Sequence, residues 1–105
     1  MAQFDVFRNP NPATAAGIPF LLDVQSGLLD HLITRVVVPL ARPELMGNKS
    51  AKNLNPGVEI HGEKLVLLTP ELAAIPVRAL GTPIANLKDK HAEIIQALDM
   101  IFSGF

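Results

Sequence analysis

Alternating apolar and polar positions mark two strands in the first quarter of the chain. Residues 3–8 (QFDVFR) and 19–25 (PFLLDVQ) both alternate in this way, which is typical of a half-buried strand. Phe4 and Val6 share one face of the first strand. In the second strand Asp23 lies opposite the apolar face, and we expect this carboxylate to face solvent.

Three more segments complete the strand pattern outside the hairpin described next. Residues 34–39 (TRVVVP) form a β-branched run, which favours a central strand over an edge strand. Residues 69–74 (TPELAA) predict a short turn, and residues 76–80 (PVRAL) predict a further short strand.

The clearest hairpin signal is at residues 58–68 (VEIHGEKLVLL). A two-residue turn at Gly62 and Glu63 suits type II′, because glycine supplies the positive φ that this turn requires. The resulting register places four apolar side chains on one face, which supports the turn assignment. It pairs Ile60 with Leu65 and Val58 with Leu67.

Three segments between the strands lack any periodicity and predict loops. Residues 9–17 and 41–56 contain Pro and Gly, and the second includes a helical turn around Pro43–Met46, where Pro suits a first helical position. Residues 26–31 (SGLLDH) break the second strand and carry a Leu-Leu pair that we expect to be exposed. An irregular segment as long as 41–56 is usually functional in a small domain.

The C-terminal part of the chain predicts one helix. Asn86 can cap it, Asp89 places a negative charge in its first turn, and Gly104 can end it. Apolar positions recur at helical spacing along one stripe. The stripe comprises Leu87, His91, Ile94, Ile95, Leu98, Ile101 and Phe102. The pattern therefore predicts an α+β domain in which antiparallel strands come first and a final helix covers one face of a curled sheet.

Composition narrows the class of protein. The 105 residues are 49% hydrophobic, carry a net charge of −1 and include no cysteine. One domain over residues 1–105 fits this length, and the lack of Cys excludes disulfides, thiolate nucleophiles and Cys-ligated metals. The charge argues against non-specific nucleic-acid binding. Without an 18-residue apolar run or a signal-peptide pattern at the start, we expect a cytoplasmic protein and no membrane partner.

No motif of catalysis or metal binding emerges. His31, His61 and His91 lie 30 residues apart, without a ligand partner at i+3 or i+4. A ribonuclease site could be assembled from Arg35, Arg78 and His61, but nothing in the sequence brings them together. We expect no enzymatic activity, no catalytic residue, no metal and no cofactor.

The end of the chain, Phe102-Ser103-Gly104-Phe105, leaves two interpretations open. Phe105 can fold back to complete the core, which residue physics favours. It can also be an exposed apolar anchor at a binding site.

Several segments, in their order and spacing, resemble the CcdB family of toxins from type II toxin–antitoxin modules. The resemblance covers nearly the whole chain. It includes the QF-x-V start, the LDVQS segment followed by Leu28, Leu29 and Asp30, the RVVVPL strand, VEIHG, AIPV, and the helix that ends in Phe102-x-Gly104-apolar.

The resemblance implies an SH3-like barrel shared with MazF/Kid-type toxins, and a homodimer. It implies that the target is the A subunit of DNA gyrase, whose DNA cleavage complex such toxins trap without covalent chemistry of their own. It also implies a CcdA-like antitoxin that neutralises the toxin, supplies the DNA-binding domain and represses the operon together with it.

Carried over by position, the gyrase contacts would lie on the second-strand turn, on the helix and at the chain end. They comprise Leu28, Leu29, Gln96, Asp99, Ser103, Gly104 and Phe105. Well-known members of the family carry Trp at the position of Ser103 and Ile at that of Phe105. Two alternatives to a gyrase poison therefore stay open: an endoribonuclease toxin on the same fold, and a non-toxic homologue that binds antitoxin only.

Overall fold

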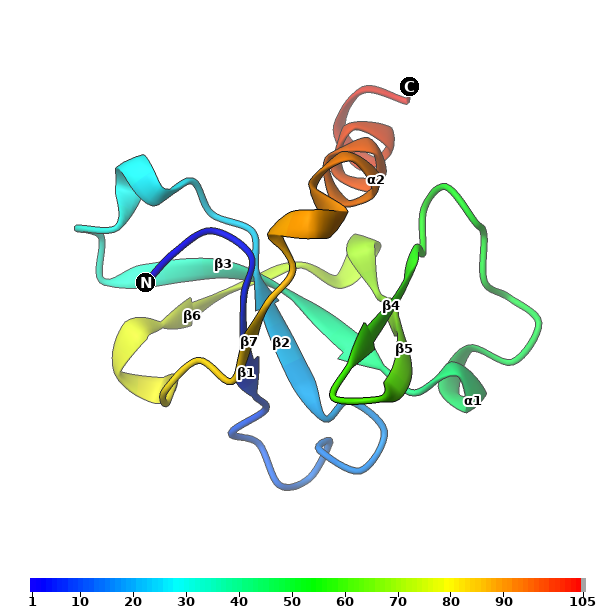
Figure 1. The fold of residues 1–105 in the computed structure, drawn as a ribbon, viewed down its shortest axis with the longest axis horizontal. Coiled ribbons are helices and arrows are strands. Elements are labelled where there is room, and N and C mark those ends of the chain that lie inside the picture. Colours follow the sequence, from blue (N-terminus) through cyan, green and yellow to red (C-terminus); the bar gives the residue numbers. More distant parts are fainter. Residues whose placement is uncertain (105) are drawn as a thin grey trace.

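The computed structural model describes residues 1–104, over which short antiparallel strands form one curled sheet (Figure 1). The strands are β1 Asp5–Arg8, β2 Phe20–Asp23, β3 Thr34–Ala41, β4 Gly57–Ile60, β5 Glu63–Leu67, β6 Ala73–Pro76 and β7 Ala85–Asn86. Their order is β4-β5-β3-β2-β1-β7, and β6 pairs with β3. The helices are α1 Pro43–Met46 and α2 His91–Ser103. Four 3-10 turns join them: η1 Gly27–Leu29, η2 Thr69–Glu71, η3 Val77–Ala79 and η4 Lys88–Lys90.

The sheet curls into a nearly closed barrel with α2 over one end (Figure 1). Its two terminal strands, β4 and β7, approach each other, since His61 Nε2 donates to the carbonyl oxygen of Ile84 at 3.1 Å. Apolar side chains from all but β6 fill the interior, and Ile94 of α2 closes it. The predicted SH3-like barrel with a C-terminal helix is confirmed, as is the central place of β3, which pairs with three strands.

The β4–β5 hairpin buries the predicted face in a different register. Val58 pairs with Leu65 and Ile60 pairs with Glu63, so the turn residues are His61 and Gly62 rather than Gly62 and Glu63. Both turn residues have positive φ, 51° and 83°, which defines a type I′ turn. The predicted pairing of Ile60 with Leu65 is therefore wrong, and so is that of Val58 with Leu67. Long-range contacts favour the observed turn, because Glu63 in the strand forms an ion pair with Arg42 and His61 reaches Ile84, the residue before β7.

The strand predicted at residues 76–80 is also misplaced. Its pairing partner β3 begins at Thr34, which lies opposite Pro76, so the ladder ends there. The chain then turns into η3, and the strand β6 begins earlier, at Ala73 within the predicted turn, and ends at Pro76, the first residue of the predicted strand. The remainder of that turn is present as η2.

The final helix starts later than its periodicity predicts. Asn86 belongs to β7, where it pairs with Asp5, and its side-chain oxygen accepts from Lys88 N at 2.8 Å. The Asn86 side chain therefore supports the start of η4, whose N-cap position is Leu87, and α2 begins only at His91. Asp89 correspondingly lies in the first turn of η4 rather than of α2.

Both faces of the N-terminal strands are covered, although their alternation predicts that one face meets water. Val6 and Leu22 point into the barrel, while Phe7 and Leu21 join a second apolar cluster with Val37 of β3 and Leu80. Asp23 is fully buried, contrary to the expected solvent face. A sheet that curls on itself encloses one face, and the chain from β6 onward covers part of the other.

Candidate protein-binding surface

Two elements at the same end of the barrel carry the predicted contact residues (Figure 1). The first is α2, whose inner side buries Ile94 and Ala97. Gln96, Asp99 and Ser103 are exposed, and at about 100° per residue they fall within about 60° of one another around the helix. The fold therefore brings these three side chains onto one outer face.

The helix ends as its sequence predicts. Gly104 takes the left-handed conformation with φ of 77°, and its N–H donates to the carbonyl oxygen of Met100 at 3.1 Å. Ser103 and Gly104 are exposed. Phe105 lies outside the described residues, so its two interpretations remain predictions.

One aromatic residue of this surface does not follow from the helical stripe. Phe102 was assigned to the apolar stripe, but it is 71% exposed. The stripe assignment omitted Ala97, which is fully buried. Ile95, two turns earlier on nearly the same side of α2, is partly buried against the core, so Phe102 is exposed because of its place in the last turn of the helix and not because of its face.

The second element is the η1 turn after β2. Ser26 caps it, because its hydroxyl oxygen accepts from Leu28 N at 3.2 Å, and Leu29 N donates to the Ser26 carbonyl at 3.0 Å. Leu28 is 88% exposed and Leu29 is 43% exposed, as predicted for this pair. Leu32 and Ile33, which follow directly, are also exposed and extend the apolar surface beyond the predicted residues.

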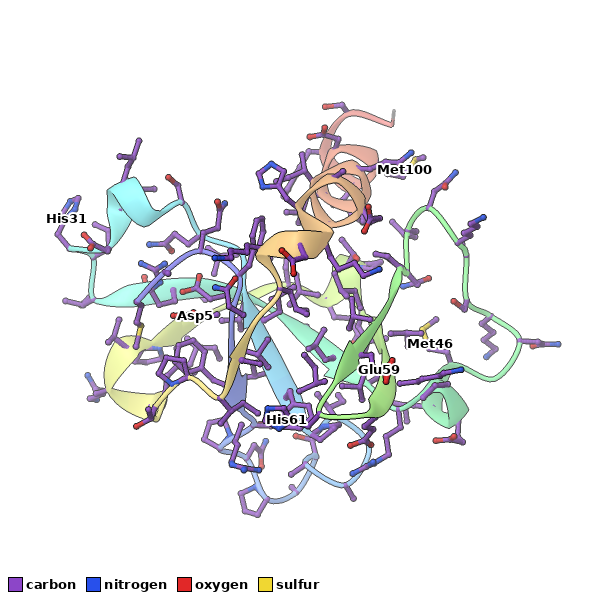
Figure 2. All side chains as sticks on the ribbon, viewed as in Figure 1. Asp5, His31, Met46, Glu59, His61 and Met100 are labelled. Atoms are coloured by element: carbon purple, nitrogen blue, oxygen red, sulfur yellow. The ribbon has the colours of Figure 1, made fainter. Side chains whose placement is uncertain are left out.

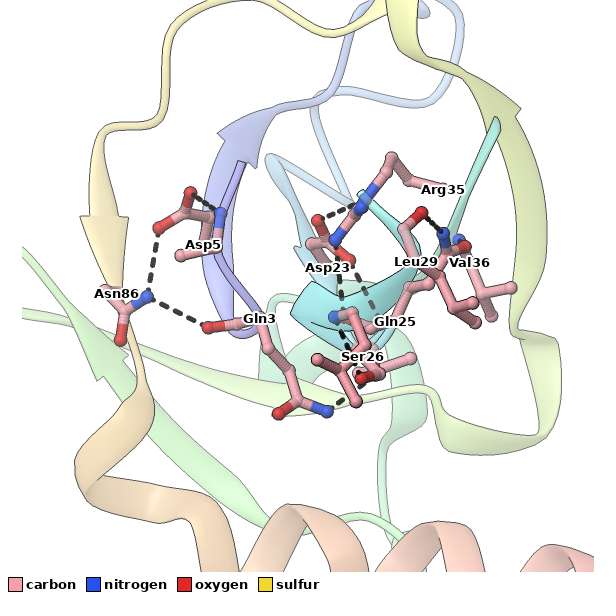
Figure 3. Close-up of polar contacts among 12 residues, drawn as sticks. Gln3, Asp5, Asp23, Gln25, Ser26, Leu29, Arg35, Val36 and Asn86 are labelled. Carbon is pink, nitrogen blue, oxygen red and sulfur yellow. Dashed lines mark hydrogen bonds and ion pairs between the residues drawn. The ribbon is translucent and has the colours of Figure 1, made fainter. Parts of the chain in front are cut away.

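A buried polar network lies directly beneath this turn (Figure 3). Arg35 Nε donates to Asp23 Oδ2 at 2.7 Å, and both side chains are fully buried. Gln25, also buried, links this ion pair to the turn. The sequence pattern placed Asp23 on a solvent face, and only the pairing of β2 with β3 shows that Arg35 is its partner.

A third region combines the two long loops. Arg42, at the start of the second loop, donates from its main-chain N to Gly17 O at 2.9 Å and from Nε to Ala16 O at 2.7 Å. The loops over residues 9–17 and 41–52 are thus joined. Arg42 also forms an ion pair with Glu63, so its charge is already engaged within the chain.

A cavity of about 590 Å³ lies between the second loop and α2. Lys52 and Asn53 line its loop side, and Lys90, Glu93 and Gln96 line its helix side. Gln96 of the helix surface and Lys52 of the loop region therefore border the same hollow.

Arg35, one of the three residues considered for a ribonuclease site, is not accessible in the fold. Arg35 is buried in its ion pair and cannot reach a phosphate from solution. Of the histidines considered as metal ligands, His31 and His61 lie far apart (Figure 2). Within residues 1–104 there is no group of three His, Cys, Asp or Glu side chains that could hold a metal ion.

The final helix and the η1 turn of this SH3-like barrel both expose large apolar side chains, as protein-binding surfaces typically do. A family model described as CcdB protein matches residues 3–104. The chain belongs to the CcdB family, and it is the toxin of a toxin–antitoxin module, with an antitoxin as its partner. No helix in the described part of the chain is long and apolar enough to cross a membrane.

Proposed function

We infer that this toxin binds the A subunit of DNA gyrase and traps the gyrase–DNA cleavage complex, which blocks replication. The observation that carries the proposal is the exposure of Leu28 at 88%, on a capped turn at the same end of the barrel as the outer face of α2. Large apolar side chains held in solvent are typical of a protein-binding surface. The toxin performs no covalent chemistry in this proposal and needs no cofactor.

Phe102 supplies an aromatic ring next to Ser103, the position at which well-known family members carry Trp. Family members use an aromatic side chain at this end of the helix, and Ser103 cannot stack on a cation. Phe102 is 71% exposed beside it and offers an aromatic face to an arginine of the target. This supports an active toxin over a non-toxic homologue.

Expression without antitoxin separates the candidate functions. A gyrase poison induces the DNA-damage response, and a gyrase mutation at the contact surface restores growth. An endoribonuclease degrades cellular RNA whatever the gyrase genotype, and a non-toxic homologue leaves growth unchanged. Either of the last two results contradicts the proposal.

Leu28→Ala is expected to lower gyrase affinity by about tenfold or more, because the side chain becomes buried only in the complex. Its melting temperature should change little, since surface substitutions typically alter stability by under ~0.5 kcal/mol. Affinity for the purified A subunit is measured by calorimetry. Leu45→Ala is the matched control, because Leu45 is an exposed leucine on α1, outside the proposed contact surface. Equal affinities of the two variants would remove Leu28 from the interface.

We also propose a homodimer in which a two-fold axis joins two copies of the surface into one. Leu32 and Ile33 are exposed and border a hollow of about 480 Å³ with Val77 and Arg78, which a second copy could cover. Sedimentation equilibrium at micromolar concentration should give about twice the chain mass of 11.3 kDa. A single species at the chain mass would contradict the dimer.

The antitoxin is proposed to bind the joined loops over residues 9–17 and 41–52. Apart from Ala41 of β3 and the short helix α1, both are irregular. Leu45 is exposed on α1, and Lys49 and Lys52 suit an extended acidic or mixed-charge segment. Hydrogen exchange of amides in both loops, such as that of Lys49, should slow when the antitoxin peptide is added. Unchanged exchange in both loops would place the antitoxin elsewhere.

Neutralisation is consistent with the cavity between the second loop and α2. An antitoxin segment that follows Lys52 into this hollow would meet Gln96 of the proposed gyrase surface. In the cytoplasm, the toxin would then contact operator DNA only through the antitoxin, and the complex would repress its own operon.

A further inference from the structure

The buried ion pair of Asp23 and Arg35 lies one hydrogen-bonded step from the proposed gyrase-binding turn. We propose that this pair acts through Gln25 as a positioning device, which holds η1 in the conformation that presents Leu28 and Leu29. The inference rests on the proposed function, because it assigns a role to residues that do not themselves reach the surface. We call the contacts of the Gln25 side chain the Gln25 clamp.

The ion pair first holds the main chain of Gln25 (Figure 3). Asp23 Oδ1 accepts from Gln25 N at 2.9 Å, and Arg35 Nη2 donates to Gln25 O at 3.3 Å. Both peptide groups next to the Gln25 Cα are therefore tied to buried charges. This arrangement fixes the backbone from which the Gln25 side chain projects.

The Gln25 clamp then connects the turn to the sheet. Its Nε2 donates to the carbonyl oxygen of Leu29 at 3.0 Å, and its Oε1 accepts from Val36 N of β3 at 3.0 Å. One amide group thus bridges the exposed turn and the central strand. Because Gln25 holds the carbonyl oxygen of Leu29, the main chain of the turn is fixed while the side chain of Leu28 projects into solvent.

A buried ion pair is an inefficient source of stability. The desolvation of two charges offsets most of their attraction, and apolar replacements of similar size are often as stable. Arg35 Nη1 is in addition buried without a hydrogen-bond partner. A geometric role accounts for a pair of this kind better than stabilisation does, because charged groups fix the directions of the hydrogen bonds they make.

A preformed turn strengthens binding by lowering its entropic cost. A flexible turn of three residues must lose its backbone freedom when it docks, and each ordered residue carries such a cost. Releasing the Gln25 clamp is therefore expected to lower gyrase affinity although every contacting side chain remains in place.

The test is Gln25→Met, which keeps the side-chain length and removes both amide contacts. Gyrase affinity should fall about tenfold. Exchange of the Leu28 and Leu29 amides, followed by NMR, should speed up about tenfold or more, while exchange of the Leu67 amide in β5 stays unchanged. Asn86→Leu is the matched control, because it also removes an amide that holds main-chain atoms on both sides. Asn86 Nδ2 donates to Gln3 O at 3.1 Å and its Oδ1 accepts from Lys88 N at 2.8 Å, outside the proposed binding surfaces, so its loss should leave gyrase affinity within about twofold.

A double-mutant cycle separates positioning from general destabilisation. If Gln25 acts through the turn, Gln25→Met should have little further effect on gyrase affinity once Leu28→Ala and Leu29→Ala together have removed the two side chains that the turn presents. A merely structural effect would add in full to that of the two alanine substitutions. Should Gln25→Met fail to fold, Gln25→Glu keeps the acceptor for Val36 N–H and releases only Leu29 O, with the same expected outcomes.

Failure of this inference differs from failure of the proposed function. If the unaltered toxin binds gyrase and the folded Gln25 variants bind equally well, the positioning role is overturned and the function stands. Full additivity in the double-mutant cycle overturns it as well. If the unaltered toxin does not bind gyrase but the turn amides of Gln25→Met still exchange faster, the clamp is real and the proposed target is wrong.

Discussion

A chain that ends at Phe102 is expected to lose gyrase binding while it keeps its fold. Ser103 and Gly104 are exposed, and the link from Gly104 N to Met100 O is a single hydrogen bond at the helix end. Removing them should cost under ~1 kcal/mol of stability. Loss of an interface anchor costs about 2 kcal/mol or more, which corresponds to about a 30-fold loss of affinity. The melting temperature and the affinity for the gyrase A subunit are both measured on the truncated toxin.

Phe105→Ala is the control that separates the contribution of the Phe105 ring to gyrase affinity from that of Ser103 and Gly104. If the aromatic ring is the anchor, this single substitution should weaken binding nearly as much as the truncation. A large fall in melting temperature for either variant would show instead that Phe105 completes the core. Unchanged toxicity of the truncated protein would remove the chain end from the mechanism.

Asp23→Ala is expected to have the largest effect on stability. It leaves the fully buried guanidinium of Arg35 without its counter-charge and Gln25 N without its acceptor. Breaking a buried ion pair on one side typically costs ~3–5 kcal/mol, a large part of the ~5–15 kcal/mol that stabilises a small domain. Urea unfolding followed by circular dichroism measures the loss as a lower midpoint.

Two further variants identify the source of that loss. Glu59→Ala removes an exposed carboxylate of β4 and should change stability by under ~0.5 kcal/mol. Replacing both partners, Asp23→Leu with Arg35→Met, should recover much of the lost stability, because no uncompensated charge remains. An Asp23→Ala variant as stable as Glu59→Ala would mean that water reaches the Arg35 guanidinium.

The sequence pattern correctly predicted the elements that depend only on residues close together in the chain. The β-branched run at residues 34–39 does lie in the central strand, Pro43 does start a helical turn, and Gly104 does end the final helix. The apolar alternation in the hairpin identified the buried face correctly even though its register was wrong. A shift of two in the pairing exchanges partners but keeps every side chain on its face, because side chains alternate with a period of two.

The sequence by itself determined that this chain is a small α+β domain with an exposed Leu-Leu turn and a helix ended by glycine, since those features depend on neighbours in the chain. Only the tertiary structure decided the turn at His61 and Gly62, the burial of Asp23 with Arg35, the joining of the two long loops through Arg42 and the exposure of Phe102. Each of these depends on a contact between segments far apart in the chain, or on which part of an element the rest of the fold covers. Periodicity shows that a residue lies on a particular face, but the free energy of burying that face is set by what packs against it.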